Sequence, residues 1–124
     1  MMNETFLEVM RHEGAVTIIS SSENAPGFHA VNTWNSYVQI SGDKLYIPAA
    51  GMHSVQQDIE KNNQVMLTVG SKEVIGTIGP GAGFHLHGTA EFITEGPIFN
   101  EMKEKFPFLS RVLKITVTEI DQKI

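Results

Sequence analysis

Residues 84–92, FHLHGTAEF, decide the fold class, because apolar and polar side chains alternate through the whole stretch. The even positions from Phe84 to Phe92 carry apolar or small side chains, and the odd positions from His85 to Glu91 carry polar ones. A period of two residues is typical of a β-strand with one face on a core and the other in water. We therefore predict a half-buried strand here, preceded by a glycine-rich turn at Gly79–Gly83.

Short strands dominate the rest of the chain. Rows of β-branched residues separated by turn residues predict strands at Ala15–Ser20, Phe28–Ile40, Leu45–Ile47, Val65–Val69 and Val112–Thr118. Helical spacing predicts three short helices: one capped by Asn3 and stopped by Gly14, one over His53–Asn62 after Pro48 ends a strand, and one from Gly96-Pro97 to Phe106. Most connections are too short for parallel crossovers, so we expect an antiparallel barrel with small helices covering its openings.

Composition limits the possible functions. The 124 residues are enough for one core, so we expect a single domain over residues 1–124. The net charge of -5 argues against nucleic acid as the main partner, since phosphate binding needs a concentrated basic surface. No apolar run is long enough to span a membrane, and the N-terminus does not resemble a secretory signal. Together with the absence of cysteine, this predicts a cytoplasmic protein.

Two local patterns suggest chemistry but do not support it alone. The loop Gly79–Gly83 lacks the spacing of a dinucleotide fingerprint and the Gly-Lys-Ser/Thr of a phosphate loop, and a strand follows it. His85 and His87 share a strand face, which suits two metal ligands, but no third ligand is positioned by the sequence, although His53 or Glu91 could approach. Strand histidines without a metal are commoner, so we predict no metal site.

Two other segments fit a flat, polar ligand. Val31–Tyr37 interrupts a strand pattern with two asparagines and the only tryptophan, and an aromatic plane among amides and hydroxyls can stack on a ring and bond its edges. Pro48–Ser54 places small residues before a helix start, where backbone N–H groups welcome an anion. A core tryptophan and an ordinary strand-to-helix turn would look similar, so the residues alone leave both interpretations open.

Taken together, these segments resemble the FMN-binding split-barrel proteins of the pyridoxamine phosphate oxidase superfamily, most closely their small bacterial FMN-binding members. The resemblance covers essentially the whole chain, and its specific part is Asn-Thr-Trp-Asn-Ser-Tyr at Asn32–Tyr37 followed by Gly-Met-His at Gly51–His53. Further matching positions are Thr5-Phe6, Glu8-Val9, Glu13-Gly14, Gly70-Ser71, Gly79–Gly81, Gly83-Phe84, Gly88, Gly96-Pro97 and Ile115–Val117. It implies a mainly β, antiparallel split β-barrel with Greek-key-like connections and short capping helices.

The resemblance also implies a homodimer with one FMN per subunit at the interface. The ring and ribityl chain would lie along Asn32, Thr33, Trp34 and Asn35, with Ser71 on the next strand near the phosphate end. The partner subunit would contribute Phe108 and Ile124 against the ring. The opposite wall of the site would be formed by Pro48, Ala49, Ala50, Gly51, Met52, His53, Ser54 and Val55.

Three departures from the family pattern reduce its cationic and stacking contacts. Ser54 and Val55 stand where relatives have Lys-Thr, His87 stands in place of Arg, and Phe108 in place of Trp. The function implied is an FMN-binding redox protein, either an electron carrier or a small flavin reductase or oxidase. The alternative is a non-redox binding module or scavenger for a flavin, heme or other planar anionic ligand. The absence of the relatives' Lys and Arg favours this alternative. The redox partner is not identified by the sequence.

Overall fold

Seven antiparallel strands form one sheet in the computed structural model, which describes residues 2–124. Across the sheet their order is β2 (Phe28–Trp34), β1 (Ala15–Ser21), β5 (Gln64–Ile75), β6 (Pro80–Ile93), β7 (Arg111–Gln122), β4 (Lys44–Ala49) and β3 (Gln39–Ser41). Every ladder is antiparallel. This confirms the predicted mainly β, antiparallel split-barrel fold.

The two edge strands of the sheet, β2 and β3, are also neighbours in the sequence. Only residues 35–38 join them, and these include the 3-10 helix η1 (Asn35–Tyr37). A connection this short brings the two edges of the sheet close together, so the sheet curls into a barrel. No ladder joins β2 to β3 or to β4 among residues 2–124, and the barrel therefore stays split on this side.

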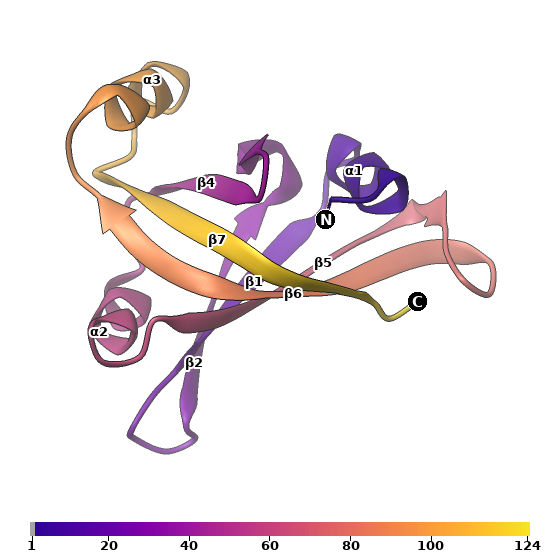
Figure 1. The fold of residues 1–124 in the computed structure, drawn as a ribbon, viewed down its shortest axis with the longest axis horizontal. Helices are drawn as coiled ribbons and strands as arrows, with labels where there is room; N and C mark the ends of the chain where they lie inside the picture. Colours follow the sequence, from indigo (N-terminus) through magenta and orange to yellow (C-terminus); the bar gives the residue numbers. More distant parts are fainter. Residues whose placement is uncertain (1) are drawn as a thin grey trace.

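Three helices lie outside the sheet: α1 (Glu4–Arg11), α2 (His53–Lys61) and α3 (Pro97–Lys105). Asn3 caps α1 by accepting a hydrogen bond from the Phe6 N–H at 2.8 Å, as predicted. The Phe6 ring packs edge-on against Phe84 with centroids 5.8 Å apart, so α1 closes one opening of the barrel. Figure 1 shows α3 at the end of the molecule opposite the C-terminus and the β5–β6 hairpin. None of the helices among residues 2–124 is long and apolar enough to cross a membrane.

The predicted core alternation is present in the strands. On β6, Phe84, Leu86 and Ala90 are buried, and on β7 Leu113, Ile115 and Val117 are buried as well. These side chains belong to one cluster inside the barrel, and a smaller cluster of Met102, Leu109 and Val112 lies under α3. Most strands run longer than predicted, because cross-strand pairing continues past the point where the apolar alternation ends.

Three local predictions were wrong. The long strand Phe28–Ile40 is divided by η1, where the buried Asn35 amide donates to the carbonyls of His12 and Val9 at the end of α1. Pro48 does not end β4: it pairs with Val112, and β3 does not extend alongside it, so its missing N–H costs no ladder bond there.

The third correction concerns Gly14, which is not the C-cap of α1. The helix ends at Arg11, and the cap residue His12 has extended backbone. Position 14 instead requires glycine because there is no room for a side chain. A Cβ atom there would lie 2.9 Å from the Gly70 carbonyl oxygen and 3.0 Å from the Asn35 amide nitrogen.

Candidate functional site

A surface cleft follows the split of the barrel, between the free edge of β2 and the segment that leads from β4 into α2. It consists of two adjoining hollows of about 220 and 230 Å³ that share Val31 and Met52. We call the whole the β2–α2 cleft, with an aromatic end and a helix end. The aromatic end is lined by Val31, Asn32, Thr33, Trp34, Tyr37, Pro48, Ala50, Gly51, Met52 and Phe108. The helix end is lined by His29, Ala30, Val31, Met52, His53, Ser54 and Val55.

Two large aromatic side chains are left open at the aromatic end. Trp34 is 48% exposed and Phe108 is 52% exposed, although both are among the bulkiest apolar residues of the chain. Tyr37 lies behind Phe108 with ring centroids 5.6 Å apart, and it also contacts Phe106 at 5.3 Å. Aromatic faces of this kind bind flat ring systems by stacking or edge contact.

Arg111 holds the turn at Ala50 and Gly51, two residues that line the aromatic end of the cleft. Its guanidinium donates to the carbonyls of Ala50 and Gly51, and Nε donates to Gln56 at 2.7 Å. The same guanidinium lies 4.9 Å from the centroid of the Phe92 ring. Since N–H and C=O groups of a peptide point in opposite directions, the N–H that follows each held carbonyl faces away from Arg111.

The helix end presents the start of α2. Met52, the residue before the helix, has the left-handed conformation (φ 64°) and gives no side-chain cap. The first helical bond runs from the Gln56 N–H to the Met52 carbonyl at 2.9 Å. The N–H groups of His53, Ser54 and Val55 therefore have no acceptor within the helix, and these residues line the cleft. Such a terminus attracts an anion.

His29 connects this end of the cleft to a buried carboxylate. Its Nδ1 lies 2.8 Å from Oδ2 of Asp58, a residue only 8% exposed, and the Ser20 hydroxyl donates to the same oxygen at 2.6 Å. Burial raises the pKa of Asp58, but the hydrogen bonds from Ser20 and His29 outweigh it and hold the pKa below its ordinary value. An ionised carboxylate only accepts, so Nδ1 carries the proton and Nε2 is the ring nitrogen available to a ligand.

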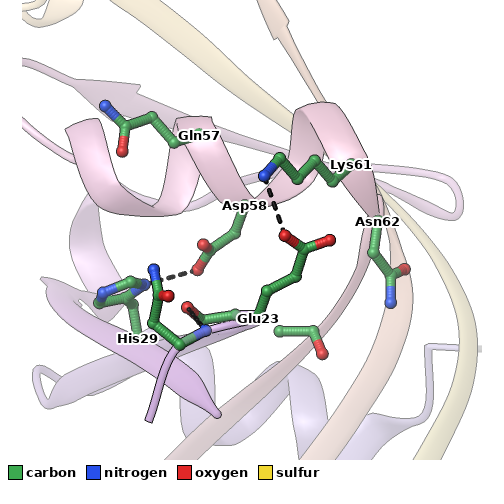
Figure 2. Close-up of a pocket in the computed structure, with 9 residues that line it drawn as sticks. Glu23, His29, Gln57, Asp58, Lys61 and Asn62 are labelled. Atoms are coloured by element: carbon green, nitrogen blue, oxygen red, sulfur yellow. Dashed lines mark hydrogen bonds and ion pairs between the residues drawn. The ribbon is translucent and has the colours of Figure 1, made fainter. Parts of the chain in front are cut away.

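A separate hollow, drawn in Figure 2, has a volume of about 300 Å³ and shares only His29 with the β2–α2 cleft. The exposed ion pair of Lys61 with Glu23, 3.0 Å long, crosses it, and Gln57 and Asn62 project from the direction of α2. All of its lining residues are polar, and none of them is Phe, Tyr or Trp. This hollow is therefore less suited to a flat ring than the β2–α2 cleft is.

Most of the residues expected at a ligand site lie in the β2–α2 cleft. These are Asn32, Thr33, Trp34, Pro48, Ala50, Gly51, Met52, His53, Ser54, Val55 and Phe108. Phe108 lines the cleft of its own chain, in contact with Tyr37, and its expected contact with a partner subunit's flavin stays a prediction.

Four expected residues lie elsewhere. Asn35 is buried against the end of α1, and Ala49 is buried in β4. Ser71 is on β5, separated from β2 by the whole width of β1. Ile124 lies against Gly83 at the far end of the β5–β6 ladder, and Ser71 pairs with Ala82 at the same end. The structure thus brings Ser71 and Ile124 near each other but not into the cleft of their own chain.

Sequence reasoning did not select His29, Ala30, Val31 or Tyr37, which also line the cleft. Val31 and Tyr37 are the end residues of the segment that suggested a ligand, although only Asn32–Asn35 within it were selected as site residues. His29 had a weaker signal, because its partner Asp58 is 29 residues away on α2 and only the fold brings them together.

Comparison with known proteins shows which family shares these features. The family model described as Pyridoxamine 5'-phosphate oxidase matches residues 2–124. The FMN-binding protein of Nitratidesulfovibrio vulgaris is 39% identical over 125 residues, covering all of both chains. Among the crystal structures that share the fold are HupZ of Group A Streptococcus (TM-score 0.76, 16% identity, 99% of this chain and 94% of that one) and an FMN-binding protein from Syntrophomonas wolfei (TM-score 0.66, 13% identity, 88% and 76%).

Proposed function

The chain belongs to the pyridoxamine 5'-phosphate oxidase family, and on this premise we propose that each subunit binds one FMN in the β2–α2 cleft and uses it to carry electrons. The observation that carries the proposal is the pairing, in one cleft, of open aromatic faces with an uncapped helix start. FMN has the matching shape, with a flat ring system at one end and a phosphate at the other.

The aromatic end suits the ring system. Trp34 and Phe108 offer apolar faces that water now covers, and burying them under a ring is favourable by about 25 cal/mol per Å² of apolar area. Asn32 is oriented by the Thr17 hydroxyl, which donates to its Oδ1 at 2.8 Å. Asn32 and the N–H groups of the Arg111-held turn provide polar contacts for the ring edge and the ribityl hydroxyls.

The helix end suits the phosphate. Its lining residues include His29, His53, Ser54 and Val55, which offer free helix-start N–H groups, a hydroxyl and two imidazoles as contacts for a phosphate. No Lys or Arg lines it among residues 2–124, so the helix start and the two histidines replace the cationic contact that relatives make. The residues present therefore fit a phosphate, with weaker charge than the family pattern provides.

The lining of the aromatic end favours an electron carrier over an enzyme with its own acid or base. Bound FMN supplies reversible one- and two-electron transfer. Among residues 2–124, Tyr37 is the single titratable side chain that lines this end, and no carboxylate, imidazole or amine does. A protein that moves protons to or from a substrate needs such a group within hydrogen-bond reach of it. Here the chain binds and orients the flavin and leaves its ring end open to a redox partner.

A homodimer would cover that open end. Ile75, Ile78 and Ile124 are strongly exposed, and they lie at one end of the molecule, since a Cβ added at Gly76 would lie 2.9 Å from the Ile124 carbonyl carbon. We call them the isoleucine end; Figure 1 shows the β5–β6 hairpin and the C-terminus there. An apolar cluster of this kind is an association surface, and a two-fold axis would bring one subunit's isoleucine end to the other's cleft. This arrangement would also bring Ile124 and Ser71 to the flavin, from the partner.

The redox role is tested on FMN-loaded protein under anaerobic conditions. We expect dithionite to bleach the flavin absorbance and a soluble one-electron acceptor to restore it, over repeated cycles and without loss of FMN. Flavin that binds but leaves the protein on reduction would contradict a carrier and favour the scavenger alternative. Turnover of NAD(P)H without an added reductase would favour a flavin reductase instead.

A further inference from the structure

The histidines of β6 lie beside two carboxylates that no feature of the flavin site uses. In the β6–β7 ladder His87 is opposite Glu119, and His85 is opposite Asp121. Side chains at alternate positions of a strand share a face, so all four project from the same side of the ladder. That side faces away from the barrel interior, because Phe84 and Leu86, which alternate with the two histidines along β6, are buried in the core.

Three of these side chains converge on one point. Nε2 of His87 lies 3.7 Å from a Glu119 oxygen and 3.8 Å from an Asp121 oxygen, and the three ligand atoms all lie within 4.8 Å of one another. Ligands about 2.1 Å from a metal ion are roughly 3.0–3.4 Å apart when they are neighbours in its coordination sphere. Small side-chain rotations therefore bring these atoms to coordination distance.

A β-bulge produces this convergence. His87 pairs with Glu119 whereas Gly88 pairs with Val117, so Thr118 is the extra residue, and its hydroxyl donates to the His87 carbonyl at 3.1 Å. A bulge increases local twist and turns side chains away from their regular directions. Glycine is required at position 88, because a Cβ there would lie 2.3 Å from the Thr116 carbonyl oxygen.

The charge around the cluster would suit a cation. Among residues 2–124, neither Glu119 nor Asp121 forms an ion pair with a Lys or Arg. Glu91 on the same ladder, by contrast, is paired with Lys114 at 3.3 Å and is not free to act as a ligand. Two carboxylates this close repel each other unless a positive charge lies between them.

His12 provides a useful contrast. It also contacts two carboxylates, but Nε2 contacts Glu8 at 3.3 Å while Nδ1 contacts Glu73 at 3.1 Å. The two acids are thus on opposite sides of the ring and share no point with it. At His87 a single nitrogen faces both acids, which is the arrangement of a ligand set rather than of a bridge between two ion pairs.

We propose that His87, Glu119 and Asp121 bind one divalent transition-metal ion, with Zn²⁺ as its probe. One imidazole nitrogen and two carboxylate oxygens suit zinc, cobalt or manganese, whereas Mg²⁺ prefers oxygen ligands alone. Three protein ligands leave at least one position for water or an external group. His85, opposite Asp121, is the nearest further imidazole on this face. None of the three residues lines the β2–α2 cleft, so this proposal does not rest on FMN binding.

The test is calorimetric titration of the untagged full chain with zinc chloride, then with MgCl₂. We expect one Zn²⁺ per chain with a dissociation constant below about 0.1 mM, and no comparable binding of Mg²⁺. His87→Ala and the isosteric double variant Glu119→Gln/Asp121→Asn should each weaken Zn²⁺ binding at least about tenfold. The matched control, His12→Ala, should bind as the parent does. Circular dichroism checks that each variant is folded.

Location is checked by adding substoichiometric Co²⁺ to ¹⁵N-labelled protein. We expect amide signals of residues 86–88 and 118–122 to broaden first, and those around His12 to persist. The proposal is overturned if the parent does not bind Zn²⁺, if His87→Ala binds it equally well, or if His12→Ala weakens binding as much. FMN content is measured alongside, so failure of this site is distinguished from failure of the flavin site.

Discussion

Nδ1 of His29 lies 2.8 Å from Oδ2 of Asp58, so a residue lining the β2–α2 cleft is hydrogen-bonded to a buried carboxylate on α2. Ser20 on β1 donates to the same oxygen, at 2.6 Å. The three side chains join β1, β2 and α2 and fix the imidazole at the helix end of the cleft. Both stability and phosphate binding should therefore depend on Asp58.

Replacing Asp58 with Asn should destabilise the protein by about 1–3 kcal/mol at pH 7, because one buried and one partly buried hydrogen bond lose their charged acceptor. The pKa of Asp58 is lowered on folding, so its contribution is present above its ordinary range near 4 and is lost as pH falls through the folded-state pKa. Urea denaturation of parent and Asp58→Asn between pH 7 and 3 should show the difference shrinking in acid. Asp43→Asn, at an exposed ion pair with Lys44, is the control and should change stability by less than about 0.5 kcal/mol. A constant difference at every pH would contradict this role.

Arg111 should control flavin affinity without touching the phosphate end. Arg111→Lys keeps the charge but cannot donate to Ala50, Gly51 and Gln56 together, so the turn loosens. We expect the dissociation constants of FMN and of riboflavin to rise equally, by about tenfold. Arg11→Lys, at an exposed pair with Glu8, should leave both unchanged. Fluorescence titration measures the dissociation constants of both flavins for the parent and the two variants, and a loss confined to FMN would mean that Arg111 acts on the phosphate instead.

A cation at the start of α2 should restore the missing phosphate contact. Ser54→Lys adds an ammonium at the helix end of the cleft, and a charge-assisted hydrogen bond is worth roughly 1.5–3 kcal/mol. FMN should then bind about tenfold tighter or more, and riboflavin, which lacks the phosphate, should gain little. The control is Ser22→Lys, in the polar hollow across His29. Calorimetry with both flavins decides: equal gains, or none, would mean that Ser54 is not at the phosphate.

The isoleucine end should determine the oligomeric state. Ile78 is 97% exposed and Ile75 and Ile124 lie nearby, so a dimer that buries them should separate when charge is introduced. We expect the parent to be a dimer by light scattering at micromolar concentration, and Ile75→Lys/Ile78→Lys to be a monomer. Phe28→Lys, at an exposed apolar residue on β2, should remain dimeric. A parent with the mass of one chain would contradict the proposed dimer.

Local patterns were enough to predict the fold class and most of the cleft. The alternation at Phe84–Phe92 reports directly on which side chains face the core, and it is correct in the structure. The segments at Asn32–Trp34 and Gly51–Val55 were selected because their residues can contact a flat, polar ligand and because both match the family pattern. Both lie within short stretches, which is why sequence reasoning found them.

Features that depend on distant pairing were not predictable. Nothing near Asn35 indicates that its amide binds α1 carbonyls 23 and 26 residues away, yet that contact divides the expected long strand. Pro48 was expected to end β4 because the sequence does not say that β3 stops short of it. Likewise Glu119 and Asp121 reach His87 only through the register of β6 and β7.

Titration of flavin-free protein with FMN tests the proposed function most directly, with emission of the only tryptophan, Trp34, as the readout. Because Trp34 lines the aromatic end, its emission should be strongly quenched and should saturate at one FMN per chain, while absorbance shows the bound flavin. Phe28→Ala, outside the cleft, should give the same curve. If emission and absorbance show no saturable binding up to roughly 100 µM flavin, the protein does not use FMN at physiological concentrations and the proposed function is wrong.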